Sequence, residues 1–176
     1  GYFTEKTTTR LRKITQSWLY ESFDKKTRKT YTKFERNTNL DREQVEAKTG
    51  VKNFAAEGEA FPVYIWNEGS AFYWWSEADS VIVDPETTQM FMGWEIIQTL
   101  DLSSFDFSEV KDMSEFFQDD KALVSLDLSD FRTDSATNME NMFRNCSTIT
   151  ELNLKSFDTS KVEKMDYMFA GCKSLK

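Results

Sequence analysis

Hydrophobic and polar positions recur with a period of 26 residues between residues 97 and 176. The recurring apolar positions are Leu100, Leu126 and Leu152; Leu102, Leu128 and Leu154; Phe105, Phe131 and Phe157; Met113, Met139 and Met165; and Phe117, Phe143 and Phe169. A fixed period of this length indicates a tandem structural repeat.

Each copy begins with a pattern typical of a strand. Leu126 and Leu128 alternate with Ser125, Asp127 and Ser129, so one face of the strand is buried and the other is wet. A segment of helical spacing follows, with apolar residues at offsets of three, three and one. These apolar residues are Val110, Met113, Phe116 and Phe117; Ala136, Met139, Met142 and Phe143; and Val162, Met165, Met168 and Phe169. Asn145 and Gly171 suit the left-handed conformation that ends a helix.

One strand and a two-turn helix cannot bury this apolar set alone, so successive copies are expected to stack. The predicted fold class is α/β: a repeat solenoid with a parallel β-sheet on one face and short helices on the other. The motif Leu-Asp-Leu-Ser-x-Phe-Asp-x-Ser-x-Val-x-x-Met-x-x-Met-Phe-x-x-Cys-x-x-Leu resembles the BspA-type leucine-rich repeat of cell-surface proteins. The chain departs from it at Asp120, which replaces a Cys, and at Phe116 and Arg132. The resemblance implies an extracellular adhesion or recognition module.

An aromatic β-hairpin is predicted ahead of the repeats, as an N-terminal cap. Its strands are 62–66 and 71–75, joined through Gly69, and 81–83 forms a third strand. Asp84-Pro85-Glu86 predicts a helix start and Gly93 its end. Met90 and Phe91 precede Phe116 and Phe117 by one period, which indicates a degenerate first repeat.

Residues 1–60 are the least patterned. Residues 40–48 are expected to form a helix closed by Gly50, and 29–34 are β-prone. The division that follows is 1–60 as an N-terminal segment or cap, 61–96 as hairpin and degenerate repeat, and 97–176 as three repeats. Residues 1–36 carry a charge of +6 against −14 for the remainder, so they either dock on the acidic body or form a mobile start.

Composition narrows the function classes. The chain has 30 acidic and 22 basic residues, a net charge of −8, which argues against nucleic-acid binding. It has no His, the commonest general base and metal ligand, and neither a nucleophile elbow nor a Gly-rich phosphate loop. No apolar run has the length of about 20 residues that a membrane helix needs. No cofactor and no metal site is therefore predicted.

The two cysteines, Cys146 and Cys172, occupy one repeat position in adjacent copies. Stacked strands bring such positions within the Cα separation of a disulfide. Their place between a helix end and the next strand favours free buried thiols over a disulfide.

Two surfaces are candidates for binding. The first surface is the outward-facing columns of the strands. One column includes Ser125 and Glu151, and the other consists of Asp101, Asp127 and Asn153. In the second column, Asp101 and Asp127 place like charges at the distance between stacked strands. The second surface is the hairpin, whose Tyr64, Trp66, Tyr73 and Trp75 either anchor a ligand or pack under residues 1–60. The alternative for the outward columns is a solvated sheet face without a ligand.

The expected function is a non-enzymatic bacterial cell-surface recognition or adhesion module. Its partners would be a host or neighbouring-cell protein or glycan, without nucleic acid and without direct membrane insertion. A structural spacer in a larger surface protein and a carbohydrate-acting enzyme are the alternatives. Leu175 falls one period after Ile149, so the chain is expected to be part of a longer, extracellular one.

Overall fold

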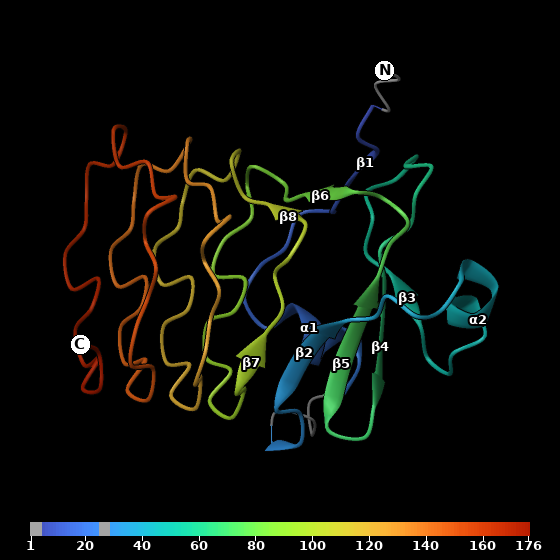
Figure 1. Ribbon diagram of the computed structural model, residues 1–176, viewed down its shortest axis with the longest axis horizontal. Coiled ribbons are helices and arrows are strands. Elements are labelled where there is room, and N and C mark those ends of the chain that lie inside the picture. Colours follow the sequence, from blue (N-terminus) through green and yellow to red (C-terminus); the bar gives the residue numbers. More distant parts are fainter. Residues whose placement is uncertain (1–4, 25–28) are drawn as a thin grey trace.

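The computed structural model describes residues 5–24 and 29–176 (Figure 1). It is β-rich, with a mixed five-stranded sheet, a three-stranded parallel sheet and two five-residue helices. The helices are α1 (Trp18–Ser22) and α2 (Arg42–Glu46). The strands are β1 (Thr8–Arg10), β2 (Lys33–Arg36), β3 (Lys52–Asn53), β4 (Tyr64–Glu68), β5 (Ala71–Trp75), β6 (Ser80–Ile82), β7 (Thr99–Leu100) and β8 (Phe105–Asp106).

The expected hairpin is confirmed as β4 and β5, which pair antiparallel from Tyr64–Trp75 to Glu68–Ala71. It forms the middle of the five-stranded sheet, whose order is β3-β4-β5-β2-β7. The strand expected at 81–83 is β6, and it pairs in parallel with β1 and β8 in the second sheet. The strand expected at 29–34 lies later, as β2. Residues 25–28 are outside the described residues.

The helix expected at 40–48 is confirmed in shorter form as α2. Asp41 caps it, since its side chain accepts a hydrogen bond from the Gln44 N–H while the Gln44 side chain accepts one from the Asp41 N–H. The helix expected after Asp84 is wrong, because the described chain makes turns there.

The predicted leucine-rich-repeat solenoid, with a parallel sheet on one face and helices on the other, is also wrong. Repeats 1, 2 and 3 (residues 97–122, 123–148 and 149–176) contain no helix among their described residues, and their strands are limited to the short β7 and β8. The segments expected to be helical run as consecutive turns instead. Both sheets lie mainly in the part of the chain before the repeats.

The repeats nevertheless stack side by side in register, as the ribbon shows (Figure 1). Isolated parallel bridges join Asp112 to Asn138 and Asn138 to Lys164, one period apart. The rings of Phe117, Phe143 and Phe169 stack in a column, with centroids 5.3 and 5.7 Å apart and planes within 7°. The 26-residue period of the sequence is thus the period of the stack.

Backbone hydrogen bonds explain why turns replace helices. Alternate N–H groups of one repeat donate to carbonyls of the next instead of to their own segment. Met113, Glu115, Phe117 and Asp119 donate to Asn138, Glu140, Met142 and Arg144, and Met139, Asn141, Phe143 and Asn145 donate to Lys164, Asp166, Met168 and Ala170. Residues between them close tight turns, for example Gln118 N–H to the Glu115 carbonyl.

One apolar core runs from Leu11 to Met168 and is continuous across the expected boundaries at residues 60 and 96. Its largest fully buried side chains before the repeats include Phe34, Phe54 and Trp94. A smaller cluster of Val45, Trp66 and Trp75 lies under α2. The domain division made from the sequence stays a prediction.

Candidate functional site

A recurring turn presents polar side chains along one face of the repeats. Between the two leucines of each copy, the Asp101, Asp127 or Asn153 side chain accepts a hydrogen bond from the N–H two residues on, over 3.0, 3.0 and 3.1 Å. This Asx turn bends the chain while the leucines stay inward. The columns that the sequence placed outward are therefore outward, with Ser125, Asp127 and Ser129 exposed and Leu126 and Leu128 buried.

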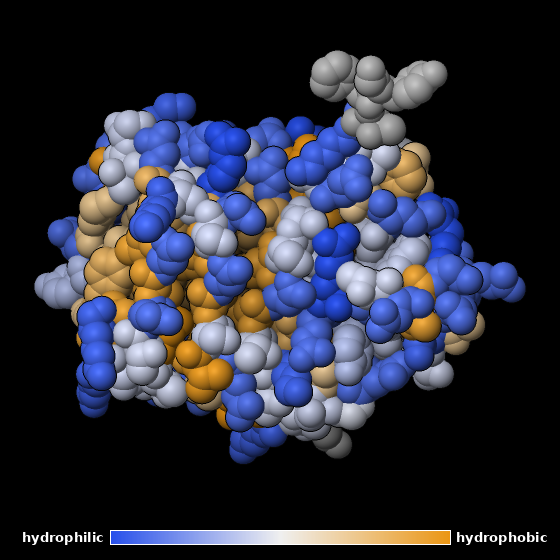
Figure 2. Space-filling model, in the orientation of Figure 1, coloured by the Kyte–Doolittle hydropathy of each residue, from blue (hydrophilic) through white to orange (hydrophobic). Residues whose placement is uncertain are grey.

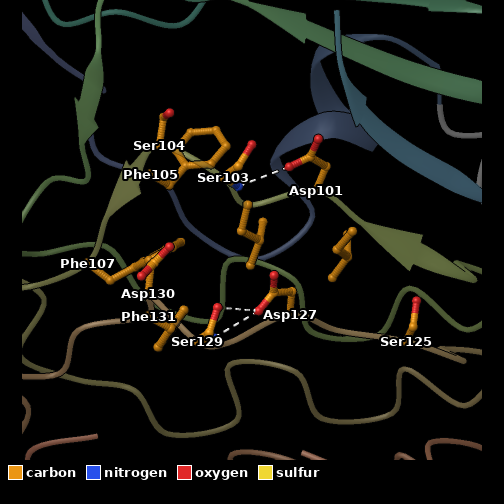
Figure 3. Close-up of a pocket in the computed structure, with 12 residues that line it drawn as sticks. Asp101, Ser103, Ser104, Phe105, Phe107, Ser125, Asp127, Ser129, Asp130 and Phe131 are labelled. Atoms are coloured by element: carbon orange, nitrogen blue, oxygen red, sulfur yellow. Dashed lines mark hydrogen bonds between the residues drawn. The ribbon is translucent and has the colours of Figure 1, made fainter. Parts of the chain in front are cut away.

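Between repeats 1 and 2 this face is hollowed into a groove of about 260 Å³ (Figure 3). Its apolar lining consists of Leu100, Leu102, Phe105, Phe107 and Phe131. Its polar lining consists of Asp101, Ser103, Ser104, Ser125, Asp127, Ser129 and Asp130. Figure 2 shows hydrophobic residues gathered over the stacked repeats, with hydrophilic residues among and around them. An apolar floor beside a few convergent polar groups is the usual composition of a binding site.

The groove carries negative charge. Asp101, Asp127 and Asp130 line it, and the described lining residues include neither Lys nor Arg. The Ser129 hydroxyl and N–H donate to Asp127 over 2.6 and 3.0 Å and lower the pKa of that carboxyl, so it is ionised at neutral pH.

A second hollow of about 680 Å³ continues the groove. The two share Ser104, Phe105, Ser129 and Asp130. The second adds Lys6, Asp79, Asp106, Arg132 and others, so its charges are mixed. Arg132 is already paired with Asp134 beside it. The first hollow is therefore the one whose charged lining residues are all acidic, and the nearest guanidinium that a hydrogen bond ties to it is that of Arg36, which donates to Ser104 over 2.6 Å.

One substitution within the repeat pattern coincides with the position of the groove. Ser156 in repeat 3 donates its hydroxyl to the carbonyls of Leu128 and Phe131, both over 2.8 Å, and ties repeat 3 to repeat 2. The same position in repeat 2 is Asp130, which has a carboxyl group in place of the hydroxyl. The equivalent tie is not found between repeats 1 and 2, where the groove lies.

The structure thus brings together three of the residues expected to bind, namely Asp101, Ser125 and Asp127. Asn153 and Glu151 are exposed one repeat further along and line neither hollow. Sequence reasoning missed Asp130 and the aromatic floor. The sequence did carry a signal for Asp130, because the equivalent residue in the other two repeats is a serine, Ser104 in repeat 1 and Ser156 in repeat 3.

The hairpin aromatics lie elsewhere and are covered. Trp66 and Trp75 are only 1% and 6% exposed, and they pack on Val45 of α2. The Trp75 indole N–H donates to the Leu40 carbonyl over 2.9 Å, and the Tyr64 hydroxyl donates to Glu46 over 2.9 Å. Tyr73 stacks on Trp66. Of the two uses that the sequence left open, the structure shows packing under the segment before residue 60.

Both cysteines are free in the structure. The Cys146 thiol donates to the Phe117 carbonyl and the Cys172 thiol to the Phe143 carbonyl, over 3.2 and 3.0 Å. Burial raises the pKa of both thiols, most strongly that of Cys146, which makes them poor nucleophiles.

Within residues 5–24 and 29–176, no three His, Cys, Asp or Glu side chains are grouped so as to hold a metal ion. Neither helix in this part of the chain has the length and apolarity that crossing a membrane requires.

Comparison with known proteins gives one match. The family model described as "Mycoplasma protein of unknown function, DUF285" matches residues 86–176, just over half of the chain. The match starts within the degenerate repeat around Met90 and Phe91 and includes every groove residue. No curated protein and no solved structure matches. On the extent of the family match, the chain belongs to the DUF285 family.

Proposed function

We propose that the chain is a non-enzymatic recognition module of the bacterial cell surface that binds a protein or a glycan in the groove between repeats 1 and 2. The observation that carries the proposal is the groove itself, in which exposed carboxylates and hydroxyls surround an apolar floor. The resemblance of the repeat motif to BspA-type surface proteins supports the location. It also supports protein or glycan as the class of partner.

The groove chemistry fits ligand groups that donate hydrogen bonds. Carboxylates accept from sugar hydroxyls and from the ammonium or guanidinium groups of a peptide. Phe105 and Phe131 are only 6% and 4% exposed, and they form the apolar floor that a sugar face or an aliphatic stem would meet. A shallow site of this kind gains effective affinity when many copies act together on a surface.

The test is a binding screen of the purified chain against glycan arrays, mucins and matrix proteins. The Asp101→Asn/Asp127→Asn variant should lose most of the binding while its melting temperature stays unchanged, since Asp127 is exposed, Asp101 is partly exposed, and Asn keeps the oxygen that accepts the turn hydrogen bond. Asp158→Asn is the matched control, because this residue makes the same Asx turn with Ser160 outside both hollows.

Binding that survives in the double variant would contradict the groove as the site. A chain that binds nothing at micromolar concentration would favour the alternative of a structural spacer.

A further inference from the structure

The groove between repeats 1 and 2 contains carboxylate oxygens that the chain itself leaves without donors. Oδ1 of Asp101 and Oδ1 of Asp127 accept the turn hydrogen bonds from Ser103 and Ser129. Among the described residues, no donor contacts Oδ2 of either side chain, and no Lys or Arg forms an ion pair with Asp101, Asp127 or Asp130. Asp101 and Asp127 come from successive repeats and lie on the same side of the groove (Figure 3). Both repeats therefore contribute unpaired negative charge.

The basic residues at the edge of the groove have partners of their own. The Arg36 guanidinium donates to the Ser104 hydroxyl over 2.6 Å. Arg132 lines only the second hollow and is paired with Asp134. A cleft lined by charges of one sign attracts ligand groups of the opposite sign. The charge of the groove therefore favours a cation as the ligand group.

The size and the floor of the groove suit a single long side chain. Its volume of about 260 Å³ is below the roughly 300–1,000 Å³ of pockets that enclose a drug-sized ligand. The buried Leu102, Phe105 and Phe131 belong to its floor. A long basic side chain packs its methylene stem on an apolar surface and keeps its charged head among polar groups. A neutral sugar would meet the same floor but would leave the carboxylates uncompensated.

A guanidinium group fits between two carboxylates better than an ammonium group does. It is planar and carries five N–H donors, so separate edges of the group can face separate carboxylates. Hydrogen bonds between charged groups are also stronger than those between neutral groups. Asp101 and Asp127 therefore favour arginine over lysine, and either of them over an uncharged side chain.

The second hollow extends the groove along a path that a peptide main chain can follow. It shares Ser104, Phe105, Ser129 and Asp130 with the first hollow. The Ser104 hydroxyl accepts from Arg36 and keeps its own proton for a ligand carbonyl. The mixed charges of the second hollow suit an uncharged backbone better than a second cation.

We propose that the groove takes an arginine side chain of a partner polypeptide, with the guanidinium between Asp101 and Asp127 and the flanking peptide along the second hollow. This inference rests on the proposed function, because it names the partner of the same groove. It narrows the partner from a protein or a glycan to a protein segment with an exposed arginine.

The test is an NMR titration of the full chain with the peptide acetyl-Gly-Gly-Arg-Gly-Gly-amide. The matched probe has citrulline in place of arginine, which keeps the shape and removes the charge. The arginine peptide should shift the amide signals of Ser103 and Ser129, the donors to the two aspartates, and should bind at least about tenfold more tightly than the citrulline peptide. Raising the ionic strength from about 0.1 M to about 1 M should weaken its binding, because the screening length falls from about 10 Å to about 3 Å.

Asp101→Asn/Asp127→Asn should reduce the affinity for the arginine peptide to that for the citrulline peptide, whereas Asp158→Asn, outside both hollows, should leave it unchanged. Equal binding of the two peptides, or no shift at Ser103 and Ser129 with the arginine peptide, overturns the inference. Methyl β-galactoside is the third probe. If it shifts these two amides and the arginine peptide does not, the inference fails while the groove stands as a glycan site. The proposed function fails separately, when binding in the screen survives the double variant.

Discussion

Asp120 is a fully buried carboxyl group with one unsatisfied oxygen. Its Oδ1 accepts the Trp94 N–H over 2.9 Å, while Oδ2 has no hydrogen-bond partner. In the next two repeats, Cys146 and Cys172 occupy this position and donate to carbonyls 29 residues earlier. The carbonyl 29 residues before Asp120 is that of Phe91. A protonated Asp120 can make the equivalent donation, and an ionised one cannot.

The stability of the chain should therefore depend on the protonation of Asp120. Burial, and then the charge of Asp119, raise the pKa of Asp120 well above its ordinary value of 3.8. The folded state thus holds this proton more tightly than the unfolded state. The resulting stability is fully present below pH 3.8 and is lost as the pH rises toward the folded pKa.

Asp120→Cys restores the repeat residue and should raise the free energy of unfolding at pH 7 by about 1–3 kcal/mol, the usual cost of an unsatisfied buried polar group. The gain should shrink on acidification, as urea unfolding between pH 4 and 8 would measure. Asp158→Asn, at an exposed carboxyl whose pKa is lowered, should show no such gain. An unchanged pH slope in Asp120→Cys would refute the role of this residue.

Gly171 is the second residue whose identity the stack requires. Its φ is +75°, and an added Cβ would lie 2.3 Å from Oδ1 of Asn145, which is held by its hydrogen bond to Asp119. Gly50 has a similar φ of +72° with open space around it.

Gly171→Ala should therefore destabilise the chain more than Gly50→Ala does. Backbone strain is common to both variants and costs about 1–3 kcal/mol. The clash adds to it only at Gly171. Thermal unfolding of the two variants gives the comparison, and equal losses would show that Asn145 moves aside freely.

At the scale of elements, the sequence predicted the hairpin and α2, because a glycine in a turn, such as Gly69, and a glycine that closes a helix, such as Gly50, are local signals. It mispredicted the segments around Met113, Met139 and Met165. Apolar offsets of three, three and one suit a helix face, but they also suit turns whose alternate N–H groups bond the next repeat. Asn145 and Gly171 do take left-handed angles, as expected, but within a row that also includes Glu115, Asn141 and Tyr167. Long-range pairing of this kind has no local signature.

The groove offers a test at the same scale. Asp130→Ser should let the new hydroxyl donate to the carbonyls of Leu102 and Phe105, as Ser156 does one repeat later. Repeats 1 and 2 should then close together, and stability should rise by about 0.5–1.5 kcal/mol for each bond. A crystal structure of the variant would show the narrowed groove, and an unchanged groove would mean that Asp130 does not set the gap.

For the molecule as a whole, the period of 26 residues was enough to predict that the copies stack and which columns face outward. It could not locate the groove, which lies where the repeat pattern is broken at a single position, Asp130. Nor could it decide whether Trp66 and Trp75 were exposed, since the segment that covers them shares no pattern with the hairpin.

The central claim is that recognition occurs in the groove between repeats 1 and 2. The most direct measurement is a hydrogen-exchange footprint of the chain with a ligand found in the binding screen. If the ligand binds in the groove, amide hydrogen exchange should slow at residues 100–107 and 125–131 and should stay unchanged at residues 64–75. Slowed exchange confined to 64–75, with the groove unaffected, would contradict it.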